Sequence, residues 1–198
     1  MTGRFISFEG IDGSGKSTQA KRLAAKLGAE AILTREPGGS RGAEDIRQLV
    51  LVGDPDRWSP ETEILLFTAA RRDHFEKTIA PALETGKTVI CDRFADSTRV
   101  YQGATRGDLR DMVDSLHRLM IGREPDLTIL IDMDPKVALA RGLARETSEQ
   151  RFEDMGLSFQ EKLRAGFLSL AEEAPERWLV VDVDGDPDQV AQRVCAQL

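Results

Sequence analysis

Cysteine is scarce in this chain, which contains only Cys91 and Cys195, far apart in the sequence. The two residues belong to no paired spacing of the kind found in zinc sites or in disulfide-stabilised folds. The sequence therefore indicates neither a structural zinc ion nor a disulfide framework. We expect both cysteines to act as small apolar side chains.

The chain also lacks an excess of basic residues and has no long apolar run. The 34 Asp and Glu residues outnumber the 27 Lys and Arg residues, and the formal net charge is −7. Binding along a nucleic acid polymer needs many cations on one face, whereas a single nucleotide needs only a few. No apolar run is long enough to cross a membrane, and the first ten residues turn polar before a signal-peptide core could form. We therefore expect a cytoplasmic protein without a nucleic acid polymer or membrane as partner.

The chain instead contains apolar runs of strand length that alternate with stretches of helical spacing. We predict strands at Phe5–Glu9, Ala31–Thr34, Thr88–Cys91, Leu127–Ile131 and Trp178–Val183. We predict helices at Lys16–Leu27, Arg41–Leu51, Pro60–Leu83, Leu109–Met120, Pro135–Arg145, Phe159–Glu173 and Pro187–Gln197. Three of the strands are almost continuously apolar, as is typical of a parallel sheet with helices on both faces. The prediction is one three-layer α/β/α domain over residues 1–198, with a five-stranded parallel sheet.

A glycine-rich segment lies between the first predicted strand and the first predicted helix. Its sequence, Gly10-Ile11-Asp12-Gly13-Ser14-Gly15-Lys16-Ser17, matches the P-loop pattern GxxxxGK[ST] in full. In this context backbone N–H groups surround phosphate oxygens, Lys16 adds a positive charge and Ser17 is a ligand for Mg²⁺. The alternative is a glycine-rich turn with a chance lysine. We predict that residues Gly10 to Thr18 bind ATP, but the motif alone fits an ATP-binding regulatory module as well as an enzyme.

Arginines at two places in the chain favour phosphoryl transfer, a reaction that depends on cations aimed at the moving charge. Arg93 follows Asp92 at the end of the third predicted strand, where open α/β sheets build their sites. Arg141, Arg145 and Arg151 lie around the polar segment ETSEQ. A salt-bridged helix end is an equally good interpretation of Arg141 or of Arg145 taken alone.

Five stretches resemble the bacterial thymidylate kinase family in order and spacing: FEGIDGSGKST, TREPGG, LLFTAARRDH, CDRFADSTRVYQG and PDLTILIDMDP. The similarity runs from Phe5 to about Asp182. It implies a P-loop nucleoside-monophosphate kinase that phosphorylates dTMP to dTDP by direct in-line transfer from Mg-ATP. It also implies a homodimer, and a short arginine-bearing lid at about residues 141–153.

The resemblance further implies the roles of individual residues. The implied dTMP pocket comprises Glu36, Pro37, Arg47, Phe67, Arg71, Arg93, Ser97, Thr98, Tyr101 and Gln102. The predicted catalytic residues are Asp12, Lys16, Arg93 and one or more of Arg141, Arg145 and Arg151, while Ser17 and Asp92 are predicted for the metal. Phe67 would stack on thymine, and Tyr101 would exclude a 2′-hydroxyl. Without the resemblance, Phe67 is better interpreted as a core aromatic and Tyr101 as a half-buried anchor.

Two positions depart from part of the family. Gly13-Ser14 stands where one branch carries an arginine, so a lid arginine would have to supply that cation. Thr98 stands where some members have asparagine. A kinase of the same fold that acts on another monophosphate or on a deoxynucleoside remains an alternative.

Overall fold

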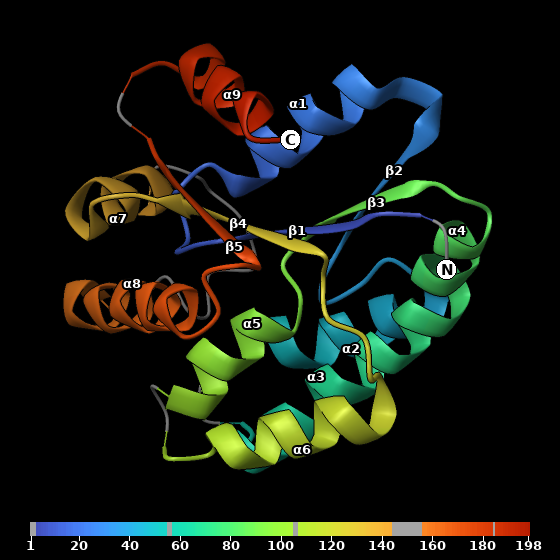
Figure 1. The fold of residues 1–198 in the computed structure, drawn as a ribbon. Helices are drawn as coiled ribbons and strands as arrows, with labels where there is room; N and C mark the ends of the chain where they lie inside the picture. Colours follow the sequence, from blue (N-terminus) through green and yellow to red (C-terminus); the bar gives the residue numbers. More distant parts are fainter. Residues whose placement is uncertain (1–2, 55–56, 105–106, 144–155, 184) are drawn as a thin grey trace.

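The structure is a computed structural model, and it describes residues 3–54, 57–104, 107–143, 156–183 and 185–198. Its centre is a sheet of five parallel strands in the order β2-β3-β1-β4-β5 (Figure 1). The strands are β1 Phe5–Glu9, β2 Ala31–Arg35, β3 Thr88–Asp92, β4 Leu127–Asp132 and β5 Trp178–Asp182. All the predicted strands are confirmed, and the observed ends differ from the predicted ones by one residue at most.

Helices connect the strands and cover both faces of the sheet (Figure 1). They are α1 Lys16–Leu27, α2 Arg41–Leu51, α3 Pro60–His74, α4 Ala80–Glu84, α5 Ala95–Thr98, α6 Arg110–Met120, α7 Pro135–Leu143, α8 Gly156–Glu173 and α9 Pro187–Ala196. The predicted three-layer α/β/α architecture is therefore confirmed. None of the described helices is both long enough and apolar enough to cross a membrane.

Alternating side chains of each strand fill the two cores of the sandwich, because successive residues of a strand point to opposite faces. Ile6 and Phe8 of β1 pack on one face with side chains of α1 and α9. Phe5, the residue before Ile6, points to the opposite face and packs with α4 and with Phe94 after β3. Phe167 of α8 belongs to a third cluster, under β4 and β5.

The long helix predicted at Pro60–Leu83 is interrupted. A π-helical turn, Phe75–Ile79, separates α3 from α4. Pro81 has no N–H to donate to the preceding turn, so a regular α-helical ladder cannot continue through it. The wider turn places both Phe75 and Ile79 in the core.

The strand order places a topological switch at β1, since the chain leaves β3 on one side of β1 and enters β4 on its other side (Figure 1). Open α/β sheets bind their ligands at such a point, beyond the carboxyl ends of the strands. Here β1 leads into the glycine-rich loop, and β3 leads into Arg93, α5 and a second π-helical turn, Arg99–Ala104. Neither α5 nor this turn was predicted, because the segment is too short and too polar to show a helical period.

Candidate active site

The loop between β1 and α1 requires glycine for steric reasons. Gly13 has a φ of 84°, and a Cβ atom there would lie 2.1 Å from the carbonyl oxygen of Ala138 in α7. A side chain at this position would therefore collide with backbone. The loop is therefore held close to α7, with a backbone conformation that glycine adopts without strain.

Lys16 begins α1 and ends this loop. Its side chain is 7% exposed, and Nζ lies 3.3 Å from both Ile11 O and Asp12 Oδ1. Burial and the nearby Arg93 guanidinium lower the pKa of Lys16, and Asp12 opposes that shift. The amino-terminal end of a helix with a buried cation beside it is an arrangement that favours an anion.

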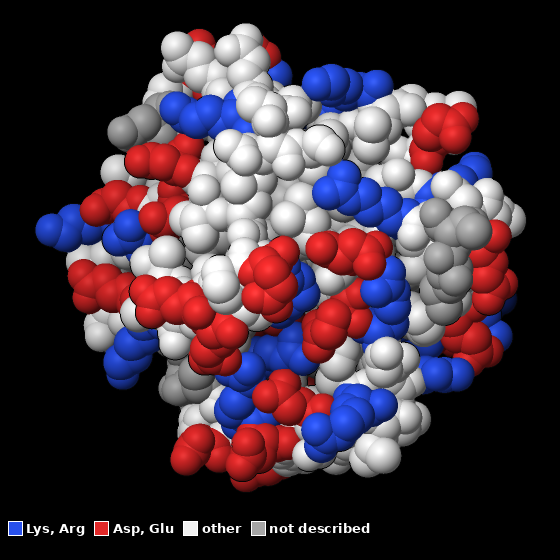
Figure 2. All heavy atoms as spheres, in the orientation of Figure 1, with Lys and Arg blue, Asp and Glu red and all other residues white. Residues whose placement is uncertain are grey.

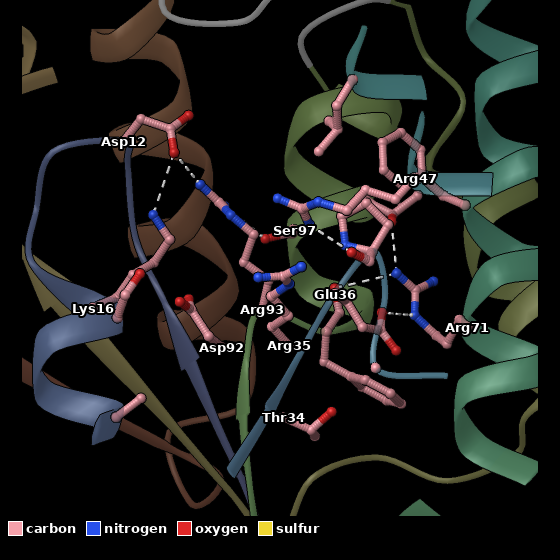
Figure 3. Close-up of a pocket in the computed structure, with 18 of the residues that line it drawn as sticks. Asp12, Lys16, Thr34, Arg35, Glu36, Arg47, Arg71, Asp92, Arg93 and Ser97 are labelled. Atoms are coloured by element: carbon pink, nitrogen blue, oxygen red, sulfur yellow. Dashed lines mark hydrogen bonds and ion pairs between the residues drawn. The ribbon is translucent and has the colours of Figure 1, made fainter. Parts of the chain in front are cut away.

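Arg93 follows β3 with a left-handed backbone, at a φ of 72°. Its amide donates to Phe8 O at 2.9 Å, which holds the turn against β1. The side chain turns back toward the glycine-rich loop, as Figure 3 shows, with Nη2 on Asp12 Oδ1 and Nη1 on Ser97 Oγ at 2.9 Å. The unusual backbone conformation thus directs a guanidinium from the carboxyl end of one strand to the loop of its neighbour.

Asp12 is the shared acceptor at this centre. Burial opposes its ionisation, but the Arg93 guanidinium, Lys16 and the Tyr101 hydroxyl outweigh burial and hold the pKa of Asp12 well below its usual range. The Tyr101 hydroxyl donates to Asp12 Oδ2 at 2.9 Å and accepts from Arg93 Nη2 at 3.1 Å. The Tyr101 ring is 6% exposed and packs edge-on against Phe159 and Phe167. Tyr101 is therefore more deeply buried than the alternative of a half-buried anchor predicts. Its hydroxyl contacts two charged residues of the candidate site.

A second group of charges lies on the other side of the cavity, where Arg71 of α3 meets the segment after β2. Arg71 Nε donates to Glu36 Oε2 at 2.7 Å, and its Nη2 donates to Thr98 Oγ1 at 2.8 Å and to Phe94 O at 3.3 Å. The side chains of Arg71 and Glu36 are 3% and 4% exposed. This buried pair holds the guanidinium in one orientation at the cavity wall (Figure 3).

Two more residues of the predicted dTMP pocket, Arg47 and Phe67, line the cavity. Arg47 of α2 donates through Nη1 to Pro37 O at 2.5 Å, and Glu44 forms an ion pair with Arg35 at 3.2 Å. Phe67 is partly exposed and lines the cavity, so it is not a core aromatic.

One cavity of about 710 Å³ joins the two groups. All the residues of the predicted dTMP pocket line it: Glu36, Pro37, Arg47, Phe67, Arg71, Arg93, Ser97, Thr98, Tyr101 and Gln102. Those of the predicted ATP and metal sites that line it are Asp12, Gly13, Gly15, Lys16, Ser17, Thr18 and Asp92. Ile11 and Ser14 are instead buried. A Cβ atom at Gly10 would lie 2.7 Å from Ile131 O.

The predicted lid arginines do not line this cavity in the described part of the chain. The Arg141 side chain is exposed, and its Nη1 lies 3.7 Å from Met133 Sδ. Arg145 and Arg151 lie outside the described residues.

Comparison with known proteins identifies the family. The thymidylate kinase family model matches residues 8–194. A curated thymidylate kinase of Dinoroseobacter shibae is 68% identical over 99% of this chain and 96% of its own length, and that of Caulobacter vibrioides is 50% identical over 97% and 94%. The crystal structure of thymidylate kinase from Ehrlichia chaffeensis has a TM-score of 0.82 at 36% identity, covering 100% of this chain and 99% of that one. The chain belongs to the thymidylate kinase family. The resemblance found in the sequence is confirmed, and with it the phosphorylation of dTMP to dTDP as the family reaction.

Three residues that shape this thymidylate kinase site were not predicted: Glu9, Thr34 and His74. Glu9 stands at the end of a strand that is otherwise apolar or small, and it is fully buried. Its Oε1 accepts from Phe94 N at 2.7 Å, and its Oε2 accepts from Ser97 Oγ at 2.6 Å. A charged residue in a buried strand was the available indication. For His74, the only local indication was its place three residues after Arg71 on the same face of a helix.

Glu9 makes the stability of this thymidylate kinase fold depend on pH. Burial and the neighbouring Asp96 raise the pKa of Glu9 from 4.5 to about 7, against the opposing effects of Arg93 and of the hydrogen bonds from Ser97 and Phe94 N. Between these two pH values the folded state keeps a proton that the unfolded state has released. The Glu9 contribution to the free energy of unfolding should therefore fall by about 3 kcal/mol as pH rises through this window.

The Glu9→Gln variant isolates that contribution, because glutamine keeps the oxygen acceptor for Phe94 N and resembles the protonated acid. The stability of Glu9→Gln relative to the unmodified chain should rise by about 3 kcal/mol between pH 4.5 and pH 8, as measured by urea unfolding. A stability difference that is the same at both pH values would contradict this assignment.

Proposed function

We propose that this chain phosphorylates dTMP with Mg-ATP as the donor, by direct in-line transfer. The observation that carries the proposal is the single cavity shared by the glycine-rich loop and the arginine-lined pocket. The donor phosphates would be bound by the loop that ends in Lys16. The acceptor phosphate would lie near Arg93, and its base would extend toward Phe67 and Arg71.

The acceptor needs no general base in this reaction. A phosphate monoester has a second pKa near 6, so dTMP is mostly a dianion at neutral pH. The residues instead supply cations: Arg93 reaches the loop through Asp12, and Lys16 contacts the same carboxylate. Substrate phosphates would compete with Asp12 for these two cations, and would thereby place both beside the transferring group.

Selection of a deoxyribonucleotide is assigned to Tyr101. Its ring is packed against two phenylalanines of α8 and its hydroxyl is bonded to Asp12 and Arg93, so it cannot move aside easily. A rigid ring beneath the sugar leaves no room for a 2′-hydroxyl, which an adaptable apolar pocket would reject poorly.

Ser17 and Asp92 are proposed to hold Mg²⁺. Asp92 Oδ1 is buried and has no hydrogen-bond partner among the described residues, and both residues line the cavity. The described residues contain no cluster of three or more His, Cys, Asp or Glu side chains that could hold a metal by itself. Magnesium in kinases usually takes one or two protein ligands together with water and substrate phosphates, so the pair suits it. When bound there, the ion would offset the negative charge of the donor phosphates.

A further cation at the transferring group is assigned to the lid, with Arg141, Arg145 and Arg151 as candidates. The loop itself supplies no arginine, since Gly13 and Ser14 occupy that place and Gly13 has no space for a side chain. In the described residues Arg141 already lies on the helix that adjoins the loop.

The proposed assembly is a homodimer in the cytoplasm. Helices α3 and α6 lie next to each other (Figure 1) and expose Leu65, Leu119 and Met120, at 51%, 78% and 44%. These side chains support pairing through this helical layer. Cys91 and Cys195 carry free thiols, as is usual in a reducing compartment. Figure 2 shows acidic and basic side chains intermixed on one face of the molecule, which fits small nucleotides better than a polymer.

The test is a rate panel with ATP and magnesium, in which dTMP, dUMP, dCMP, dGMP, AMP and thymidine are compared as acceptors. We expect the highest kcat/KM with dTMP and no turnover of thymidine, because the acceptor site is built around a phosphate. Preferred turnover of another acceptor would replace the substrate assignment. The absence of any diphosphate product would leave an ATP-binding module as the better interpretation.

A further inference from the structure

His74 lies at the end of α3, fully buried behind the wall of the acceptor pocket. Its ring connects Thr34 of β2 with Glu36, the residue that follows this strand. Nδ1 is 3.2 Å from Glu36 Oε1, and Nε2 is 2.7 Å from Thr34 Oγ1. The ring also fills the space beside Gly39, where a Cβ atom would lie 2.3 Å from Nε2. The segment is therefore shaped around this imidazole.

The partners of the ring determine which nitrogen carries the proton. Glu36 Oε2 accepts from Arg71 Nε, and a carboxylate can only accept, so we assign His74 Nδ1 as the donor to Oε1. In the neutral ring Nε2 is then an acceptor, and it receives the hydrogen of the Thr34 hydroxyl. The result is a directed chain of hydrogen bonds, from Thr34 to His74 to Glu36, that meets the Arg71 donor at the carboxylate.

This chain ends on the guanidinium of Arg71, which lines the cavity. Arg71 Nε is bound to Glu36, Nη2 is bound to Thr98 and to the Phe94 carbonyl, and the Phe94 ring lies 5.3 Å from its central carbon. Nη1 has no hydrogen-bond partner among the described residues, and Arg71 lines the cavity. Two N–H groups in a fixed position are thus available for an acceptor atom of a bound nucleotide.

We propose that His74 is a positioning residue for the acceptor nucleotide, acting through Glu36 on Arg71. The inference rests on the proposed function, because it assigns Arg71 to the acceptor. Without the Nδ1 donor, Glu36 Oε1 would be buried without a hydrogen bond, which costs free energy. Rotation of the carboxylate toward another donor would then become favourable. Rotation of Glu36 releases Arg71 Nε and turns the guanidinium away from the position in which Nη1 meets the ligand.

The kinetic experiment compares His74→Asn with His74→Leu. The asparagine side-chain nitrogen can occupy the place of Nδ1 and donate to Glu36, whereas leucine fills the volume without a donor. We expect His74→Leu to raise the KM for dTMP about tenfold, the effect of one hydrogen bond to a charged group. His74→Asn should stay close to the unmodified chain, and the KM for ATP should be unchanged in both variants.

The second histidine of the chain provides a matched control. His117 is also buried, with Nε2 3.2 Å from Glu124, but it belongs to α6 and does not line the cavity. His117→Leu should lower stability without changing the KM for dTMP. An unchanged KM for dTMP in His74→Leu would overturn the proposal, and so would equal increases in both KM values, which would show a general loss of structure.

Imidazole ¹⁵N NMR of the unmodified chain tests the same idea without a variant, since only two histidines contribute. We expect His74 to show a protonated Nδ1 and an unprotonated Nε2, and to respond to dTMP more strongly than His117 does. A His74 ring protonated only at Nε2 would overturn the proposal. Failure of the proposed function would be seen separately, as an unmodified chain that makes no dTDP.

Discussion

Replacement of Arg93 by alanine should lower kcat roughly a thousandfold, because it removes a cation directed at the transferring phosphoryl group. Arg93 Nη2 contacts Asp12 of the glycine-rich loop and the Tyr101 hydroxyl, and in the proposed function its guanidinium lies between donor and acceptor. ATP binding should be nearly unchanged, since the loop backbone and Lys16 remain. Coupled-enzyme kinetics give kcat, and titration calorimetry gives the affinity for ATP.

The left-handed backbone at Arg93 makes a control necessary. At a φ of 72° alanine is strained but glycine is not, so Arg93→Gly removes the charge and relieves the backbone. Equal loss of turnover in Arg93→Ala and Arg93→Gly would assign the effect to the side chain. Recovery of turnover in the glycine variant would assign it to the backbone, and a loss of ATP affinity as large as the loss of kcat would contradict the role in transfer.

Replacement of Asp96 by alanine should destabilise the fold by about 3–5 kcal/mol, because it leaves arginines buried without their shared partner. Asp96 is fully buried, with Oδ1 2.7 Å from Arg99 Nη1 and Oδ2 2.7 Å from Arg177 Nη1. The carboxylate thus links α5 to Arg177, the residue before β5, which also donates to Thr128 of β4. Urea unfolding at pH 7 measures the loss directly.

An exposed ion pair provides the comparison. Glu76 lies 3.0 Å from Lys77, but both side chains are half exposed or more, so Glu76→Gln should leave the unfolding midpoint unchanged. A loss at Asp96 of less than about 1 kcal/mol would place it with such surface pairs and contradict the prediction. Asp96→Asn has a further expected effect: the pKa of Glu9 should fall, because Asp96 is one of the groups that raise it.

Much of the fold could be predicted from the sequence because it depends on near neighbours in the chain. The apolar run Phe5–Glu9 and the glycines that follow it predict a strand, a connecting loop and a helix, and the structure has this arrangement. The π-helical turn at Phe75–Ile79 was not predicted. A proline indicates where regular α-helical hydrogen bonding is interrupted, but not which local structure replaces it. The helix α5 was missed for a different reason, since its four residues are too few to show a period.

The residues of the candidate site likewise include some that the sequence predicts and others that only the structure identifies. By itself the sequence determined the strands, the glycine-rich loop with Lys16, and the arginine that follows β3, since each is encoded by residues a few positions apart. Only the tertiary structure decided which charges meet: Arg93 with Asp12, 81 residues away, and Arg71 with Glu36, 35 residues away. The pairing of buried charges depends on strand order and on the orientation of packed helices, and no local pattern records either. For the same reason Glu9 and His74, which contact the site from behind, became recognisable only once the sheet and its helices were in place.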